Sequence, residues 1–409
     1  MTDRSVGLPP GADVVVVRQG EVGTKSEQVR SKMVRRLREN VVALLDDRGI
    51  DATVETRRYR LLLHTDDPEA VTGAATDAFG VVSASPARRV DPTIEAIGEA
   101  LADCARTHYD GGTFAVSARR AGERGDHPFS SQDIQREGGS AVWDAAEAAG
   151  VDPEVDLDEP DFELFVECRA ETAYVFTEKR AGPGGLPLGT QDPVVALVSG
   201  GHDSPVAAWE LMKRGSPVVP LYVDLGDYGG ADHQARAAST VAQLARYAPE
   251  RDTRLRVAPA GPEIDAIASG VEDGRMLVLR RFMFRVAEAV ARDANAVGIV
   301  TGEAIGQKSS QTTANLAATS AAVDLPVHRP LLSRDKTAIT ERADAIGTFE
   351  ESSIPAGCHR LAPDFPETRA DPAAVAAAEP DDVAERARAV ADDVRIVDVA
   401  TSRAVERPE

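Results

Sequence analysis

The stretch VVALVSGGHDSPVAAWELMKRG (residues 194–215) decides how the largest part of the chain folds. It starts with a valine-rich apolar run of the kind found in buried parallel strands. Two glycines and a Ser-Pro pair break this run, and apolar residues then resume at helical spacing. We expect Ser204 to be the N-cap of that helix and Pro205 its first residue. A strand, a glycine turn and a helix N-terminus direct backbone N–H groups at one point, which predicts a phosphate site.

The loop of this motif differs from the commonest phosphate loop. A Walker-type loop contains Gly-Lys-Ser/Thr, whose lysine reaches the β- and γ-phosphates, and residues 199–204 contain no lysine. Chemistry that turns ATP into ADP is therefore disfavoured. Phosphates would repel Asp203 unless Mg²⁺ stood between them, so we assign Asp203 to the positioning of metal and pyrophosphate. The alternatives are an ordinary tight turn for the loop and a helix-capping role for Asp203.

The composition indicates an acidic, intracellular protein of several domains. The 409 residues have a net charge of −21, and lysine is scarce among the basic residues, as in proteins adapted to a salt-saturated cytoplasm. The chain has no apolar run of membrane-spanning length and no apolar signal core at its start, so we expect a cytoplasmic protein that does not enter a membrane. Three cysteines are too few for a disulfide framework. We expect Cys104 and Cys168 to be buried core residues.

The first sixty residues predict a strand, a helix and a second strand. The strands are expected at residues 12–17 and 57–64, and the helix between them starts after Ser26 and ends at Gly49. Residues 11–60 hold 11 basic and 8 acidic side chains within an acidic chain. The basic face of this helix could therefore meet nucleic acid. The alternative is a solvated helix face.

The rest of the chain contains a mixed unit, a linker and a long alternating segment. We expect helices at 92–107 and 131–149 and strands at 114–120, 164–168 and 173–178, then a Gly/Pro-rich linker at 182–193. From residue 194 to 301 strands and helices alternate, which predicts a doubly wound parallel sheet with its ligand at the carboxyl ends of the strands. The last stretch is rich in alanine and acidic residues and predicts a solvated helix, a short strand VRIVDV and a tail.

Several motifs together resemble one family. FAVSARRAGERGDHPFSSQDIQREGGSAVW (114–143) resembles the THUMP RNA-binding module, and SGGHDSP resembles the SGGxDS loop of the ATP pyrophosphatase (PP-loop) superfamily. GEVGTKS (20–26), TGEAIGQKSSQTTANL (301–316), RPLLSRDKTAI (329–339) and IPAGCHRLAPDFPETRA (354–370) extend the resemblance, to the tRNA 4-thiouridine synthetases, over most of the chain. It implies an α/β protein with an N-terminal ferredoxin-like domain (1–69), a THUMP domain (70–180), a PP-loop ATP pyrophosphatase domain (181–370) and an acidic C-terminal extension (371–409).

The resemblance implies a role for individual residues. The catalytic residues would be Asp203, Lys336 and Cys358, with Asp203 also meeting Mg²⁺ through pyrophosphate. Those that bind ATP would be Leu197, Val198, Ser199, Gly200, Gly201, Ser204, Tyr222, Val223, Arg280, Gly302 and Gln311. Those that bind tRNA would be Lys25, Arg119, Arg120 and Arg124, together with His127. His202 stands where an aromatic residue is more usual in the family.

The resemblance also implies a reaction. With ATP and Mg²⁺, the family adenylylates the uridine at position 8 of tRNA and replaces its O4 with sulfur. We expect no rhodanese domain and no CxxC iron–sulfur site at Cys358, so the sulfur would come from outside, from a persulfide protein or from sulfide. A homodimer is expected. Two alternatives remain: sulfur transfer to the C-terminus of a sulfur-carrier protein for thiamine thiazole synthesis, and a catalytically inert tRNA-binding protein.

Overall fold

The computed structural model describes residues 7–24, 26–57, 60–121, 125–229, 231–349, 361 and 367–399. The chain forms two compact units, Met1–Pro187 and Leu188–Glu409, and each is described by itself. The boundary falls inside the Gly/Pro-rich segment that the sequence marks as a linker. No helix in the described ranges is long and apolar enough to cross a membrane.

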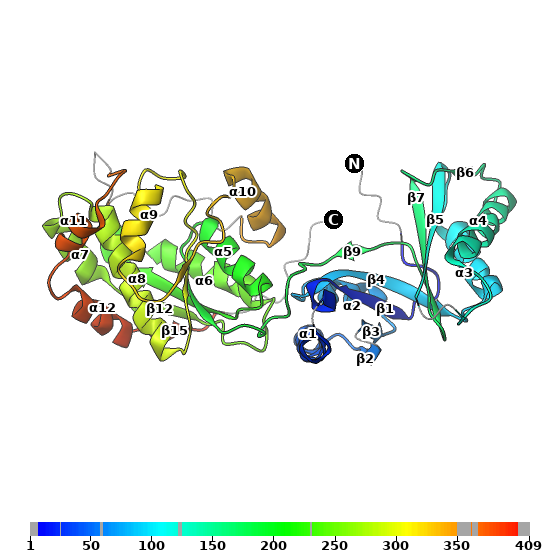
Figure 1. Ribbon diagram of the computed structural model, residues 1–409, viewed down its shortest axis with the longest axis horizontal. Coiled ribbons are helices and arrows are strands. Elements are labelled where there is room, and N and C mark those ends of the chain that lie inside the picture. Colours follow the sequence, from blue (N-terminus) through cyan, green and yellow to red (C-terminus); the bar gives the residue numbers. More distant parts are fainter. Residues whose placement is uncertain are drawn as a thin grey trace. The chain divides into compact units, whose positions relative to one another are not determined.

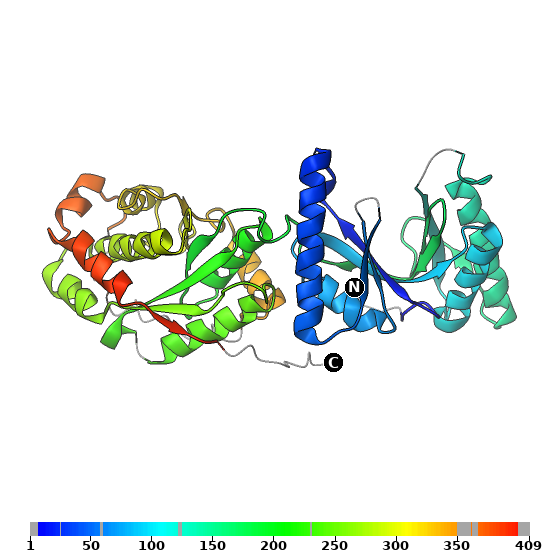
Figure 2. The same ribbon diagram turned by 90° about the horizontal axis from the view of Figure 1, so that it is seen from below.

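The first unit is a sheet with two pairs of helices (Figures 1 and 2). Its strand order is β2-β3-β1-β4-β8-β7-β5-β6, and β9 also pairs with β4. The elements are β1 (Val14–Gln19), η1 (Glu21–Thr24), α1 (Glu27–Arg48), β2 (Thr53–Arg57), β3 (Arg60–His64), α2 (Pro68–Ala75), β4 (Val81–Val90), α3 (Ile94–His108), β5 (Thr113–Arg120), α4 (Ser131–Ala148), β6 (Glu154–Val155), β7 (Phe162–Cys168), β8 (Ala173–Phe176) and β9 (Arg180–Ala181).

Helix α1 forms as the sequence predicts. Leu37, Val41 and Leu44 lie on one face and are almost fully buried. Ser26 stands at the N-cap, and Gly49 ends the helix with φ 64°, a left-handed conformation that favours glycine. The apolar faces of α1 and α2 pack against alternate residues of β1, β3 and β4. The single strand predicted at 57–64 is instead the hairpin of β2 and β3.

The long strand β4 joins the two halves of this sheet, and the sequence analysis missed it. Its first part pairs with β1 and its last three residues pair with β8. Helices α3 and α4 pack against each other and against β5, β7 and β8. On the face of β1 and β3 turned away from α1, Val14, Val16 and Leu62 form a second small core with aromatic residues of β7 and β8. The ferredoxin-like and THUMP regions therefore share one continuous sheet.

The second unit is a doubly wound sheet, as predicted. Among the described residues its strand order is β14-β13-β10-β11-β12-β15, in which β15 pairs antiparallel with β12 and the other pairs are parallel. The elements are β10 (Val194–Leu197), α5 (Asp203–Lys213), β11 (Val218–Asp224), η2 (Gly226–Tyr228), α6 (Ala231–Ala245), β12 (Leu255–Pro259), α7 (Gly261–Gly270), α8 (Arg275–Asp293), β13 (Ile299–Val300), α9 (Thr313–Ser320), β14 (Val327–His328), α10 (Lys336–Ala345), α11 (Pro372–Ala377), α12 (Val383–Asp392) and β15 (Arg395–Val397).

The strand order of the second unit fixes where its ligand site lies. The chain starts at the central strand β10, moves outward to β11 and β12, and then returns to place β13 on the other side of β10. Right-handed crossovers to opposite sides put helices on both faces of the sheet. The loops that leave β10 and β13 therefore separate at their carboxyl ends, and this opening is where doubly wound folds bind ligands.

The segment after residue 370 is part of the second unit's core, so the prediction that its helix is solvated was wrong. Val383, Ala387 and Val390 of α12 are buried in the main apolar cluster of this unit. Glu379 accepts hydrogen bonds from Arg281 and Arg285 of α8, at 2.8 and 2.7 Å. Strand β15 pairs with β12 and closes the edge of the sheet. The acid-rich composition suggested a solvated helix, because composition alone does not show that one face of the helix packs against the core.

Candidate functional site

The glycine loop between β10 and α5 is closed by its own serines. The backbone N–H of Ser199 donates to Ser204 Oγ at 2.9 Å, and the N–H of Gly201 donates to Ser199 Oγ at 3.3 Å. The prediction that Ser204 caps the helix was wrong, because α5 begins at Asp203 after an N-cap at His202. Pro205 is therefore the third helical residue, where its missing N–H still leaves no helix bond unmade. The Ser204 hydroxyl shapes the loop instead of capping the helix.

The loop after β13 touches the start of α5. A Cβ on Gly302 would stand 2.7 Å from the carbonyl carbon of Asp203 and 2.8 Å from the backbone N of Ser204. Real Cβ atoms do not approach backbone so closely, so only glycine fits at this position. The two loops at the strand-order switch therefore form one continuous surface around the N-terminus of α5.

Lys336, the first residue of α10, reaches the same point. Its Nζ donates to Asp203 Oδ1 at 3.1 Å and also contacts His202 Nε2. His202 Nε2 lies 3.5 Å from Asp203 Oδ1. Burial lowers the pKa of His202 below its ordinary value; Asp203 raises this pKa and Lys336 lowers it further. The neutral imidazole is the form that accepts a hydrogen bond from an ammonium group.

Two other residues predicted to bind ATP, Arg280 and Gln311, lie beside the β13 loop. Arg280 of α8 donates to the carbonyl of Ser310 at 3.1 Å and lies 3.2 Å from Glu303, the neighbour of Gly302. Gln311 is buried, and its Oε1 has no hydrogen-bond partner among the described residues. A buried amide oxygen without a partner is costly, so it marks a place where a ligand donor fits.

The remaining predicted nucleotide contacts lie at the ends of β10 and β11. Val198 donates its backbone N–H to the carbonyl of Leu221 at 2.9 Å, and Leu197 pairs with the same residue. Tyr222 and Val223 follow on β11 and are buried. These four predicted residues lie on adjacent strands at the carboxyl edge, next to the glycine loop.

Arg119 and Arg120, predicted to bind tRNA, end strand β5 in the first unit. Arg119 is exposed, whereas Arg120 Nη1 donates to the carbonyl of Phe129 at 2.7 Å and so holds the segment before α4. His127 Nε2 lies 2.9 Å from the carbonyl oxygen of Arg169. Lys25, Arg124 and Cys358 lie outside the described residues.

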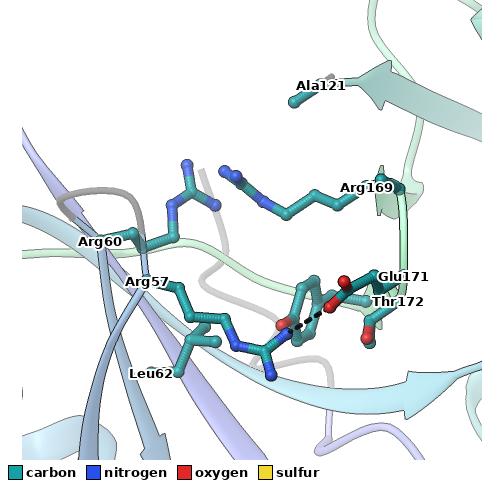
Figure 3. A pocket seen from close by; sticks show the side chains of 9 residues that line it. Arg57, Arg60, Leu62, Ala121, Arg169, Glu171 and Thr172 are labelled. Atoms are coloured by element: carbon teal, nitrogen blue, oxygen red, sulfur yellow. Dashed lines mark hydrogen bonds and ion pairs between the residues drawn. The ribbon is translucent and has the colours of Figure 1, made fainter. Parts of the chain in front are cut away.

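The first unit also contains an arginine-lined pocket that the sequence analysis missed. The pocket of about 240 Å³ is lined by Arg57, Arg60, Leu62, Ala121, Arg169, Ala170, Glu171, Thr172 and Tyr174, which we call the arginine pocket. Figure 3 shows the side chains of Arg60 and Arg169 extending toward each other across it, while Arg57 pairs with Glu171 at 3.3 Å.

The arginines around the pocket outnumber the carboxylates that pair with them. Buried Glu167 pairs with Arg60 and Arg169, and the hydrogen bonds and charges of these arginines keep its pKa low although burial acts to raise it. Burial lowers the pKa of nearby Arg18 to about 10, and the neighbouring arginines contribute to this although Glu167 opposes it. Arg57 is paired with Glu55 and Glu171, whereas Arg18, Arg60 and Arg169 share the single carboxylate of Glu167, which leaves positive charge for an anion on that side of the pocket.

Comparison with known proteins places the chain in a family. It is 58% identical over 395 residues to a probable tRNA sulfurtransferase of Halobacterium salinarum, covering 97% of this chain and 100% of the relative. It is 41% identical over 368 residues to a probable tRNA sulfurtransferase of Methanosarcina acetivorans, covering 89% and 88%. The chain belongs to the tRNA sulfurtransferase family.

Family models and solved structures agree with this membership in the tRNA sulfurtransferase family. Models described as thiamine biosynthesis protein (ThiI), THUMP domain and ThiI ferredoxin-like domain match residues 189–382, 92–178 and 14–85. A crystal structure of a 4-thiouridine synthetase–RNA complex with bound ATP superposes with a TM-score of 0.80 at 28% identity, covering 94% of this chain and 99% of that one. A protein of Pyrococcus horikoshii superposes with a TM-score of 0.63 at 25% identity, covering 82% and 99%.

In this member of the tRNA sulfurtransferase family, Arg236 also lies at the glycine loop, and the sequence did not predict it there. Arg236 of α6 is only 9% exposed, and its Nη1 would lie 3.6 Å from a Cβ on Gly200. The topology could have indicated this position, because a helix that follows the next parallel strand starts at the same edge of the sheet. No local sequence motif does so, because Arg236, one turn into that helix, looks like any other helical arginine.

The two cysteines that the structure describes, Cys104 and Cys168, are fully buried, as predicted. Burial raises the pKa of the Cys104 thiol to about 12 and that of Cys168 to about 11. Neither thiol is a nucleophile near neutral pH, because the thiolate is the reactive form. A reactive cysteine in this chain would have to be Cys358.

Proposed function

We propose that the protein is an ATP-dependent tRNA sulfurtransferase that converts uridine 8 of tRNA to 4-thiouridine. The observation that carries this proposal is the glycine loop at the N-terminus of α5, with Lys336 held over it 3.1 Å from Asp203. This is a site for pyrophosphate in a chain whose first unit matches the THUMP domain. The family relatives named tRNA sulfurtransferase support the same reaction.

The loop is suited to cleavage between the α- and β-phosphates. Its backbone N–H groups and the α5 N-terminus favour an anion, and Lys336 and Arg236 add positive charge from two other helices. Because these groups surround the loop, they stabilise the charge that develops on a departing pyrophosphate. Uridine O4 would attack the α-phosphorus, pyrophosphate would leave, and the product would be an O4-adenylylated uridine.

The donor set at the loop fits Mg²⁺ bridged by phosphates, but not a metal held by protein alone. No group of three or more His, Cys, Asp or Glu residues in the described ranges could hold a metal ion. Asp203 supplies one carboxylate, which is 31% exposed at the start of α5. Mg²⁺ commonly binds one or two carboxylates together with substrate phosphates and keeps several waters. Asp203 would hold it there, and the ion would neutralise phosphate charge.

The adenosine end of ATP would lie along the carboxyl edge of β10 and β11. Leu197, Val198, Tyr222 and Val223 supply backbone and apolar surface there. Gln311 Oε1, which lacks a partner among the described residues, could accept a hydrogen bond from an amino or hydroxyl group. The ATP-bound structural neighbour supports ATP as the nucleotide.

The arginine pocket and Arg119 are proposed to contact the tRNA backbone. Arginine forks match phosphate oxygens, and such contacts position an RNA without reading its sequence. A chain of net charge −21 repels RNA overall, so local clusters of this kind must carry the attraction. At high salt the counterion-release contribution is small, and recognition then depends on hydrogen bonds and shape.

The sulfur step replaces AMP at C4 of the activated base. Sulfide attacks C4, the C4–O4 bond breaks, and AMP leaves with O4. If Cys358 instead carries the sulfur as a persulfide, its terminal sulfur attacks C4, and a second, external thiol must then take up Cys358 in a disulfide to release the product. We propose an external donor in either case, and a cytoplasmic homodimer as the working form.

A second function is favoured by one observation. The family model that matches residues 189–382 is described as a thiamine biosynthesis protein. The same adenylylation could act on the C-terminal carboxylate of a sulfur-carrier protein, because a carboxylate oxygen and uridine O4 are both acyl-type oxygens that become good leaving groups as AMP esters.

The test is reconstitution with purified components. The protein is incubated in concentrated KCl with ATP, Mg²⁺, unmodified tRNA and sulfide, and the tRNA is digested for mass spectrometry, with Cys358→Ser in parallel. We expect 4-thiouridine from the wild type. Its formation by both proteins would show direct attack by sulfide. AMP formation without 4-thiouridine would point to another acceptor, and no AMP at all would overturn the enzymatic proposal.

A further inference from the structure

His202 has three neighbours that connect separate parts of the nucleotide site. It stands at the N-cap of α5, its Nε2 contacts Lys336 Nζ, and it lies beside the Asp203 carboxylate. Its ring also packs against Phe349, with 6.2 Å between the ring centroids. The side chain is 21% exposed, so it is largely enclosed by these groups. None of the predicted site roles included His202.

Lys336 needs such partners to act at the loop. Its side chain is 52% exposed and has a flexible four-carbon stem, so the ammonium group has many positions available to it in solvent. An ammonium group has three N–H donors. Asp203 accepts one of them at 3.1 Å, and the contact with His202 takes a second from another direction. Two acceptors at an angle fix where the third N–H points.

We propose that His202 is a positioning residue: its Nε2 accepts a hydrogen bond from Lys336 and, together with Asp203, holds the ammonium group with one N–H free for the departing pyrophosphate. The inference rests on the proposed function of the loop as a pyrophosphate site. A carbon ring at position 202 would keep the packing against Phe349 but would offer Lys336 no acceptor. His202 does not touch the reacting atoms itself, and its whole effect passes through Lys336.

A double-mutant cycle tests this chain of contacts. His202→Phe, Lys336→Ala and the double variant are assayed for pyrophosphate release from ATP, and calorimetry measures the binding of pyrophosphate and of AMP. Loss of a charge-assisted hydrogen bond predicts a fall of roughly tenfold in kcat/KM for His202→Phe. In the Lys336→Ala background the same substitution is expected to change nothing further. His202→Gln, which keeps an acceptor, should recover part of the loss.

AMP binding separates positioning from structural damage. AMP lacks the phosphates that Lys336 would meet, so we expect His202→Phe to weaken pyrophosphate and leave AMP binding unchanged. Additive effects in the cycle, or equal weakening of AMP and pyrophosphate, would overturn the inference. The cycle is repeated with His202→Leu, so that it does not depend on one variant folding, and Lys213→Ala at the far end of α5 serves as the matched lysine control.

The calorimetric arm does not depend on the identity of the acceptor, because pyrophosphate and AMP bind without turnover. A wild type that binds ATP and pyrophosphate but yields no 4-thiouridine would refute the proposed tRNA reaction, while the same cycle in pyrophosphate affinity would still decide the role of His202. Conversely, if the protein forms 4-thiouridine but the effects of the His202 and Lys336 substitutions are additive, the proposed function stands and the positioning role of His202 is refuted.

Discussion

Substituting alanine for Gly302 tests whether the two loops at the sheet edge form one site. The added Cβ would stand 2.7 Å from the carbonyl carbon of Asp203 and 2.8 Å from the N of Ser204, both of which are backbone atoms. Ordinary contact begins near 3.4 Å, so the start of α5 or the β13 loop must move by more than half an ångström. Overpacking of this kind costs about 1–3 kcal/mol of folding free energy.

The effect on catalysis should exceed the effect on stability. A displacement of about 1 Å in a catalytic constellation can cost on the order of 100-fold in rate, so we expect a fall of roughly 10- to 100-fold in kcat/KM for pyrophosphate release. Gly270→Ala is the matched control, because a Cβ there meets nothing within 4 Å. Thermal unfolding measures the stability term separately. Wild-type kcat and KM in Gly302→Ala would refute the contact between the loops.

Four further predictions follow from individual contacts. Arg236→Gln should weaken the binding of ATP and pyrophosphate by roughly tenfold without affecting AMP, and equal loss of all three by calorimetry would contradict its assignment to the loop. Native protein at pH 8 should leave Cys104 and Cys168 unalkylated until it unfolds, as peptide mass spectrometry can check, because both thiol pKa values lie at about 11 or above. Glu379→Gln should destabilise the second unit by about 3–5 kcal/mol, since buried Arg281 and partly buried Arg285 lose the negative charge that pairs with them. Burial acts to raise the pKa of Glu379 but the arginines lower it below its ordinary value, so the stabilisation is present at neutral pH and should be lost in acid, as the pH falls through that lowered pKa. Arg169→Gln should weaken tRNA binding, measured by filter binding at fixed salt, and unchanged affinity would remove the arginine pocket from the tRNA surface.

Much of the fold could be predicted because its signals are local. The apolar spacing of α1, its Ser26 N-cap and its Gly49 end all lie within one stretch of sequence. The alternation of strands and helices after residue 194 likewise specifies a doubly wound sheet. Its site then follows from the strand order, because the loop with Gly302 must lie beside the loop after β10. The family resemblance supplied most of the individual residue assignments at this edge.

What the sequence did not predict depends on contacts between distant segments. Ser204 looks like a helix cap, yet its hydroxyl is used to close the loop with Ser199. The strand VRIVDV could be predicted and contains β15, but its pairing with β12 and the burial of α12 in the core could not. The arginine pocket combines β2, β3 and the turn between β7 and β8, and Arg60 and Arg169 are more than a hundred residues apart in the chain. Such sites leave no short motif.

The central claim is that uridine O4 is activated as an AMP ester at the glycine loop. The most direct measurement uses tRNA that carries ¹⁸O at O4 of uridine 8, incubated with the protein, ATP, Mg²⁺ and sulfide. Mass spectrometry then follows the label. We predict one ¹⁸O atom in the phosphate of AMP for each 4-thiouridine formed. Formation of 4-thiouridine with unlabelled AMP would contradict the account, because O4 would then have left by another route.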